Sequence, residues 1–274
     1  MTDHSGVGFP AMVNADADYS GRPSSARIYD ALLGGNHNFE VDREAAKRLL
    51  SMIPAAGEMA RANRAFLNRA VRFLLDAGVR QFLDIGSGIP TVGNVHEIAQ
   101  SREPGARVVY VDIDPVAVAH AGEILRDNPL ATAVQADMRF PQAILDHAEV
   151  RKLIDLDRPV GLLLVSMLHF VPDDDAFVAV DRLREALPAG SYVVVSHGVS
   201  ETPADAAGEG VAQLYQRTDV STATGRSRDQ ILRFFGDAEL VPPGLVWVNE
   251  WPDGPQDDAE PCDMAVVAAI GRKS

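Results

Sequence analysis

A strand-like apolar segment that runs into an acidic residue and two glycines constrains the fold of this 274-residue chain more than any other feature. The segment reads FLDIGSGIPT and contains Asp84, Gly86 and Gly88. Glycines at this spacing let the backbone turn sharply and come close to a bulky ligand where a side chain would collide. In open α/β sheets, ligands bind beyond the carboxyl ends of the strands. The segment therefore predicts a strand, a tight turn and a ligand site at one edge of a sheet.

Apolar segments and helical segments alternate from this point onward. We expect strands over residues 81–85, 107–112, 132–135, 160–166 and 192–196, and helices over residues 94–100, 115–126, 141–145 and 176–186. Continuous apolar runs such as residues 162–165 suit strands that are buried on both faces, as in parallel sheets. Because strand–helix alternation implies right-handed crossovers, the sequence predicts a doubly wound α/β fold.

The C-terminal part has a different pattern. A helix is expected over residues 227–235, followed by apolar strands over residues 244–248 and 264–270 with a polar loop between them. Two strands joined in this way pair most easily antiparallel, so we expect them at one edge of the sheet. Residues 197–225 are rich in small and polar residues, with a short helix expected near residues 207–216, and we interpret them as a variable loop or lid.

The N-terminal part precedes the first expected strand. Residues 1–23 show no apolar period and are predicted to be a mobile tail. Residues 24–78 are predicted to form a helical cap, with helices over residues 24–33, 42–52 and 56–77. Residues 24–274 are therefore expected to fold as a single domain that carries this cap.

The cap contains the segment ARIYDALLGGNHNFEVDREAA, whose polar residues surround a double glycine. Among them, Tyr29, Gly35, Asn36 and Asn38 are candidates for contacts with a substrate. The segment would then fold over the ligand site and exclude water from it. The alternative is a helix–turn–helix that packs beside the sheet without a role in binding.

Composition narrows the classes of partner. The formal net charge of −14 disfavours a nucleic-acid-binding surface, which needs a concentrated basic patch, and leaves a small neutral or cationic substrate. The chain has no run of about 18 apolar residues, so we expect no membrane helix. The single cysteine, Cys262, excludes an internal disulfide and favours a cytoplasmic location.

Further acidic residues follow the next two strands. Asp112 ends the second strand, where a carboxylate can accept hydrogen bonds from both ribose hydroxyls of a bound nucleoside. Asp137 follows the third strand, where it can accept from an adenine amine while Met138 packs on the ring. Ile113 is also expected to contact the cofactor, whereas Asp114 is expected to cap the helix that begins at residue 115.

Two nucleoside cofactors compete for this arrangement. A nicotinamide site needs a third glycine where Thr91 stands, and an acid roughly 20 residues after the first glycine, whereas Asp112 lies 26 positions after Gly86. Asp84 would also repel an incoming pyrophosphate. The sulfonium and ammonium groups of S-adenosylmethionine carry the opposite charge, so the sequence favours S-adenosylmethionine over NAD.

The fourth and fifth strands bring two histidines to the same edge. Ser166 and His169 follow the fourth strand, and His197 follows the fifth. Ser166 is expected to contact the cofactor. With an ordinary pKa near 6.5, His169 is a candidate general base, or else a structural histidine that bonds the backbone; His197 is a weaker candidate for a substrate contact. No pair of the seven histidines has metal-ligand spacing with acids or the cysteine, so no metal site is predicted.

Taken together with NRAFLNRAVRFL, VVYVDIDPVAVAHA, LLLVSMLHFVPDDD and ILRFFGDAELVPPGLV, these motifs resemble a bacterial family of S-adenosylmethionine-dependent methyltransferases over about residues 24–270. The resemblance implies the class I methyltransferase fold, a Rossmann-like, seven-stranded, mostly parallel sheet with an antiparallel last strand and helices on both faces. It also assigns the cofactor-binding turn to Asp84, Gly86, Ser87 and Gly88, the ribose to Asp112 and the adenine side to Asp137. Ile89-Pro90 stands where the wider class often has a third glycine.

The expected function is methyl transfer from S-adenosylmethionine to a small-molecule acceptor, with S-adenosylhomocysteine as the product. Such a displacement needs little acid–base help when the acceptor is already nucleophilic, because in-line positioning lowers the barrier by about 7 kcal/mol or more. The alternatives are a non-catalytic S-adenosylmethionine-binding module or sensor and, less favoured, an NAD(P)-dependent oxidoreductase.

Overall fold

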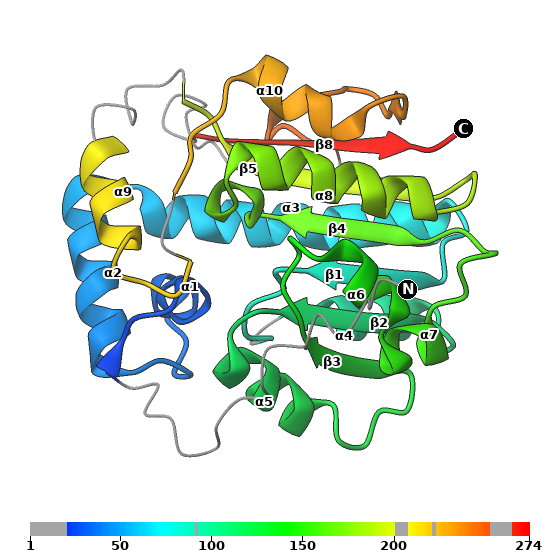
Figure 1. Cartoon of the computed structure of the whole chain (residues 1–274), viewed down its shortest axis with the longest axis horizontal. Coiled ribbons are helices and arrows are strands. Elements are labelled where there is room, and N and C mark those ends of the chain that lie inside the picture. Colours follow the sequence, from blue (N-terminus) through cyan, green and yellow to red (C-terminus); the bar gives the residue numbers. More distant parts are fainter. Residues whose placement is uncertain (1–20, 91–92, 201–207, 221–222, 253–264) are drawn as a thin grey trace, which may run out of the picture.

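A mixed sheet forms the centre of the protein in the computed structural model, which describes residues 21–90, 93–200, 208–220, 223–252 and 265–274 (Figure 1). Its strands are β1 (Gln81–Ile85), β2 (Arg107–Asp112), β3 (Ala131–Gln135), β4 (Gly161–Val165), β5 (Tyr192–Gly198), β6 (Glu239–Leu240), β7 (Val246–Trp247) and β8 (Val266–Arg272). They lie in the order β3-β2-β1-β4-β5-β8-β6, and β7 also pairs with β8. Strands β1 to β5 are parallel, and β8 runs antiparallel to β5.

This arrangement confirms the predicted α/β fold and the antiparallel C-terminal strands. The described residues form eight strands where the sequence predicted seven, because β6 has only two residues and shows no apolar period. The last strand lies inside the sheet instead of at its edge, since β8 pairs with β5 on one side and with β6 and β7 on the other. Six of its seven residues are buried, as expected for a strand with neighbours on both sides.

Helices cover both faces of the sheet. They are α1 (Ser25–Leu32), α2 (Glu40–Met52), α3 (Ala56–Asp76), α4 (Val95–Arg102), α5 (Pro115–Ile124), α6 (Pro141–Asp146), α7 (Ala148–Leu153), α8 (Asp173–Ala186), α9 (Gly208–Tyr215) and α10 (Arg228–Leu232), with 3-10 turns η2 (Leu168–Phe170) and η4 (Arg233–Phe235). The sequence did not predict α7 and η2, which are too short to show a helical period. Helix α8 begins three residues earlier than expected, because Asp173, Asp174 and Asp175 occupy its first turn, where carboxylates favour the positive end of the helix dipole.

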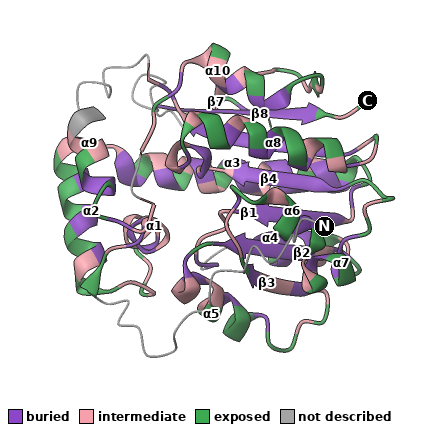
Figure 2. Cartoon of the chain, in the orientation of Figure 1, coloured by how far each residue is buried: buried purple, intermediate pink, exposed green. Residues whose placement is uncertain are grey.

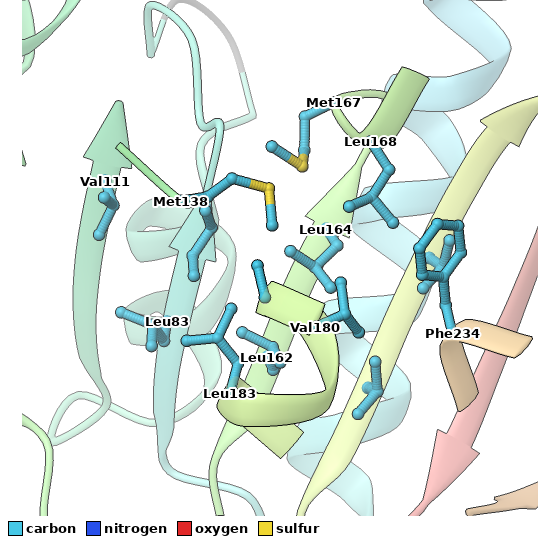
Figure 3. Packing of buried hydrophobic residues seen from close by; sticks show 14 of the residues in the cluster. Leu83, Val111, Met138, Leu162, Leu164, Met167, Leu168, Val180, Leu183 and Phe234 are labelled. Carbon is cyan, nitrogen blue, oxygen red and sulfur yellow. The ribbon is translucent and has the colours of Figure 1, made fainter. Parts of the chain in front are cut away.

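Alternate residues of each central strand face opposite layers. Leu162 and Leu164 of β4 pack with Val180 and Leu183 of α8 (Figure 3). Leu163, between them, belongs to the cluster on the other face, where α3 and α4 lie. Figure 2 shows the strands as almost entirely buried and the outer sides of the surrounding helices as exposed. Burial on both faces explains why the central strands read as continuous apolar runs.

The parallel strands point toward a small helical subassembly formed by α1, α2 and α9 (Figure 1). A separate apolar cluster holds it together and includes Ile28 of α1, Leu49 of α2, and Leu214 and Tyr215 of α9. We call these three helices the cap. This cap differs from the one predicted over residues 24–78. Helix α3 lies in that range but packs on the sheet through residues such as Phe66, and α9 comes from the segment that was expected to be a lid. The predicted tail comprised residues 1–23, of which residues 1–20 lie outside the described residues.

A buried ionic network joins the cap to the sheet. Arg27 of α1 pairs with Asp42 of α2 at 2.9 Å and with Asp114 at 3.3 Å. Asp114 also accepts from the Ser24 hydroxyl and, as the sequence predicted, caps α5 by accepting from the Val116 N–H at 2.9 Å. Because all of these side chains are nearly inaccessible to water, the network fixes the cap against the strand end that carries Asp112.

Candidate cofactor and acceptor site

One cavity of about 580 Å³ lies between the carboxyl ends of the parallel strands and the cap. All nine residues that the sequence assigned to the cofactor line it, namely Asp84, Gly86, Ser87, Gly88, Asp112, Ile113, Asp137, Met138 and Ser166. Two of the other candidates, Tyr29 and His169, line it as well. Residues separated by more than 100 positions therefore meet at one site, because parallel strands place their carboxyl ends along one edge of the sheet.

The turn after β1 has a backbone that requires glycine. Gly86 and Gly88 have φ angles of +67° and +64°, in the left-handed region that other residues rarely adopt. A Cβ atom on Gly86 would lie 2.5 Å from the Met167 Cβ atom, so both conformation and packing demand glycine there. The N–H groups of Gly86 and Ser87 donate to the Val111 carbonyl at 2.8 and 3.2 Å, which holds the turn against β2.

Asp112 connects this turn to the end of β2. Its two carboxylate oxygens accept from the Gly88 N–H at 2.7 Å and from the Asp114 N–H at 2.9 Å. Burial raises the pKa of Asp112 to about 6, although both backbone hydrogen bonds oppose this change. The carboxylate is therefore held in one orientation at the cavity wall and is mainly ionised at neutral pH.

Asp84 differs from Asp112 because the described part of the chain provides no hydrogen-bond donor to its carboxylate. Its side chain is buried, and burial together with the nearby charge of Asp112 raises its pKa to about 7, while Arg64 acts in the opposite direction. A buried carboxylate without a partner is unfavourable unless a ligand supplies one. A positively charged group of a ligand fits this position.

The carboxylate of the third acid, Asp137, is held by Arg139. Both of its carboxylate oxygens accept from the Arg139 side chain, at 2.5 to 3.1 Å, and one also accepts from the Arg139 N–H at 2.9 Å. A carboxylate offers about four acceptor positions, so it keeps room for a further donor. Met138 belongs to the apolar core (Figure 3). It also lines the cavity, as does Ile113, which exposes 40% of its surface.

Ser166, directly after β4, has a strained backbone conformation. Among the described residues it is the one non-glycine residue with positive φ, at 56°. Its N–H donates to the Ser196 carbonyl and hydroxyl, and that hydroxyl donates to Asn63 of α3 at 2.6 Å. Asn63 in turn donates to the Tyr29 hydroxyl, which donates to the Ala60 carbonyl, both at 3.0 Å. Backbone strain of this kind collects at functional sites, and here a chain of hydrogen bonds joins it to the cap.

Comparison with known proteins agrees with this geometry. A family profile described as S-adenosyl methyltransferase matches residues 12–274. The chain belongs to this family. It is therefore an S-adenosylmethionine-dependent methyltransferase, which confirms the predicted family, enzyme class and cofactor. Family membership favours methyl transfer over both a non-catalytic sensor and an NAD(P)-dependent oxidoreductase.

Two solved structures are similar to the methyltransferase over nearly all of its length. A candidate methyltransferase from Thermobifida fusca is 44% identical, with a TM-score of 0.87, and the alignment covers 94% of this chain and 97% of that one. A DUF574 family protein from Streptomyces avermitilis is 41% identical, with a TM-score of 0.88 and coverage of 93% and 99%. No curated protein gave a match.

His169 of the methyltransferase lines the cavity, but its surroundings disfavour the protonated ring. Its Nδ1 atom is buried without a hydrogen-bond partner, so it does not bond the backbone as a structural histidine would through that atom. The ring contacts Phe170 and His197, with centroids 4.1 and 5.4 Å away. Burial, with the nearby His197 and Arg226, lowers the pKa of His169 well below its ordinary value. The ring is therefore neutral, and its role as a base remains a prediction.

His197 does not line the cavity, and two hydrogen bonds fix its ring. Its Nε2 atom lies 2.8 Å from Arg226 and must accept, because a guanidinium only donates, so Nδ1 carries the hydrogen and donates to the Gly198 carbonyl at 2.6 Å. Burial lowers the pKa of His197 to about 3. Arg226 also donates to the carbonyls of Leu168 and Val171, so the pair orders the segment that carries His169.

The remaining cap candidates, Gly35, Asn36 and Asn38, do not line the cavity either. Their loop folds around the buried Asp30 carboxylate, which accepts from the His37 N–H at 2.9 Å and from the Asn38 side chain at 2.8 Å. A Cβ atom on Gly35 would collide with the Asp30 carboxylate. The double glycine and its polar neighbours thus build the cap instead of contacting a ligand in the cavity.

Several lining residues were not among those predicted from the sequence. Among them are Arg64 of α3, Phe170 after β4, Tyr215 of α9 and Asp219 after it. Asp219 accepts from the Ser25 N–H at 2.9 Å and leaves its other carboxylate oxygen buried without a partner. Helical or loop segments carry these residues, and no strand-end pattern marks them. Tertiary packing of α3, α9 and the segment after β4 brings them to the site.

The described residues contain neither a metal-binding cluster nor a membrane-spanning helix. Across the described ranges, no group of three or more His, Cys, Asp or Glu side chains could hold a metal ion. Within the same ranges, no helix has the length and apolar character needed to cross a membrane.

Proposed function

We propose that the cavity holds S-adenosylmethionine at the carboxyl ends of β1, β2 and β4 and a small, mainly apolar acceptor beneath the cap. One observation carries this proposal: the carboxylates at the strand ends and the apolar side chains of the cap line the same continuous cavity of about 580 Å³. A volume of this size is within the usual range for small-molecule sites, which is roughly 300–1,000 Å³.

The cofactor half of the cavity contains one residue for each polar part of a nucleoside. Asp112 is placed to accept from the ribose hydroxyls, because two backbone N–H groups already fix its orientation. Asp137 would accept from the adenine amine, with Ile113 and Met138 packing against the ring. When bound, the cofactor supplies a methyl group on a positively charged sulfur. The Asp84 carboxylate would stabilise the cofactor's positive charge.

The acceptor half of the cavity is apolar. Its walls come from α1, α2, α3 and α9 and include Leu32, Leu49, Ile53, Met59, Val211 and Tyr215. Burial of apolar surface favours binding at about 25 cal/mol for each Å² removed from water. An acceptor with an aromatic or aliphatic body fits these walls, and the protein's net charge of −14 supports a neutral or cationic one.

The chain's catalytic contribution would be mainly positioning. His169 is a weak base, since its pKa lies well below the ordinary value. We therefore favour an acceptor whose reacting atom is already nucleophilic, such as a neutral amine. The protein would hold that atom in line with the methyl carbon, and would exclude water with the cap, a combination that lowers the barrier by about 7 kcal/mol or more. For a hydroxyl acceptor, His169 is the candidate base.

Calorimetric titration with S-adenosylmethionine and S-adenosylhomocysteine tests the cofactor half. The wild type should bind both. Asp112→Asn should weaken binding about 10- to 100-fold, because hydrogen bonds to a charged group contribute about 1.5–3 kcal/mol. Asp157→Asn, which changes an exposed aspartate, is the matched control and should bind like the wild type. Wild-type protein that binds neither ligand, or equal affinities in Asp112→Asn, would contradict the proposed site.

We also propose that the protein works in the cytoplasm on a small molecule without nucleic acid as a partner. The single cysteine supports the location, because secreted proteins of this kind more often carry disulfides. The acidic balance of 39 Asp and Glu against 25 Lys and Arg supports the absence of a nucleic-acid partner.

A further inference from the structure

Arg64 of α3 is a cation at the cavity wall that has no anionic partner in the described part of the chain. It lines the cavity beside Asp84 and Tyr29. Its Nε atom is buried and makes no hydrogen bond, and it forms no ion pair with a described acidic residue within 4.0 Å. A partly desolvated guanidinium with an unpaired donor is unfavourable unless a ligand supplies an acceptor.

Two neighbours show where that acceptor would lie. The Arg64 Cζ atom lies 6.0 Å from the centre of the Tyr29 ring, whose hydroxyl is fixed by Asn63 and Ala60. On the other side, Arg64 is near enough to Asp84 to influence it electrostatically. The two opposite charges therefore lie on one stretch of the wall without touching each other.

A separated cation and anion of this kind match the two ends of an amino-acid zwitterion. An α-amino acid carries a carboxylate and an ammonium group on the same carbon atom. The carboxylate would meet the guanidinium, whose planar donors suit bidentate binding, and the ammonium would meet the unpartnered carboxylate. Within S-adenosylmethionine, the methionine end is the part with this chemistry.

We propose that Arg64 binds the α-carboxylate of the cofactor's methionine end while Asp84 binds the adjacent ammonium group. This inference rests on the proposed placement of the cofactor along β1, β2 and β4. An acceptor carboxylate is the other source of an anion at this position. The cofactor is favoured because Asp84 directly precedes the Gly86–Gly88 turn, whereas the acceptor walls formed by α2 and α9 are apolar.

Titration with S-adenosylhomocysteine and with its decarboxylated analogue tests the inference. The two ligands differ only in the carboxylate. The wild type should bind S-adenosylhomocysteine about 10- to 100-fold more tightly than the analogue. Arg64→Met should remove this preference and leave the affinity for the analogue unchanged. Arg64→Lys should retain part of the preference, because it keeps the charge but loses the bidentate geometry.

Arg72→Met is the matched control, since Arg72 is an exposed arginine on the same helix that does not line the cavity. It should keep the wild-type preference. If Arg64→Met keeps the preference, or weakens binding of both ligands equally, the inference is overturned and the proposed function stands. If the wild type binds neither ligand, the proposed placement of the cofactor is itself wrong. Unchanged binding of the analogue by Arg64→Met also shows that the variant is folded.

Discussion

Replacement of Asp84 by asparagine should stabilise the protein in alkaline solution while weakening cofactor binding. Burial raises the pKa of Asp84 from an ordinary 3.8 to about 7, a value that already includes the opposing charge of Arg64. At about 1.4 kcal/mol for each pKa unit, the ionised carboxylate destabilises the folded protein by about 4 kcal/mol at pH 8. Asparagine has nearly the same shape and no charge, so Asp84→Asn should increase the free energy of unfolding by up to that amount.

The effect has a definite pH dependence. Because the pKa of Asp84 is higher in the folded state, the stability that its protonated form contributes is fully present below pH 3.8. That stability is lost as the pH rises through about 7. The advantage of Asp84→Asn over the wild type should therefore fall from about 4 kcal/mol at pH 8 to about 2 kcal/mol at pH 5.5.

Urea unfolding of the wild type, Asp84→Asn and Asp157→Asn at both pH values measures these differences. Asp157→Asn alters an exposed carboxylate and should show no comparable dependence on pH. In the same proteins, only Asp84→Asn should lose affinity for S-adenosylmethionine. A variant that is less stable than the wild type at pH 8, or whose advantage does not change between pH 5.5 and 8, would refute the reasoning.

Two further substitutions test residues that hold the cavity wall in place. Arg226→Met should lower the free energy of unfolding by about 3 kcal/mol or more, because it removes the donors to the Val171 carbonyl and to the buried His197 Nε2 atom, and one of the two donors to the Leu168 carbonyl. Thermal unfolding measures this, and a change within 1 kcal/mol would contradict it. Gly86→Ala should destabilise the protein more than Gly93→Ala and also abolish cofactor binding. The two glycines have nearly equal φ angles, but a Cβ atom on Gly93 meets nothing within 4 Å, so equal losses in both variants would show that the contact with Met167 is unimportant.

The sequence predicted which residues at the strand ends would come together, and the structure places them along one cavity. Asp84, Asp112 and Asp137 could be assigned because each follows an apolar run, and the topology of a parallel sheet brings such positions together. The bounds of β1 and β2 were also predicted correctly, since strands buried on both faces leave uninterrupted apolar segments. The two-residue strand β6 has no such signal and was missed. Strand β7 lies within the longer apolar strand predicted over residues 244–248.

The cap could not be predicted in the same way. Gly35 and Asn38 have the composition of a ligand-binding loop, yet their partner is Asp30 within the same segment. Composition indicates that polar groups need partners but does not identify those partners. His197 and Arg226 meet across 29 positions only because β5 and the start of α10 come together.

Arg64 is a residue of the site that the sequence could not have identified. Helix α3 carries arginines at several positions, and helical periodicity separates its apolar face from its polar face. It does not specify which arginine meets a cavity and which meets solvent. That depends on how α3 is rotated and placed against β1 and α1, which is set by tertiary packing.

The structure of the protein in complex with S-adenosylhomocysteine tests the central claim most directly. We predict that the ribose hydroxyls lie within hydrogen-bond distance of the Asp112 carboxylate and that the sulfur lies beside the Gly86–Gly88 turn, facing the apolar walls of the cap. Ligand bound outside this cavity, or bound inside it with the ribose remote from Asp112, would contradict the account.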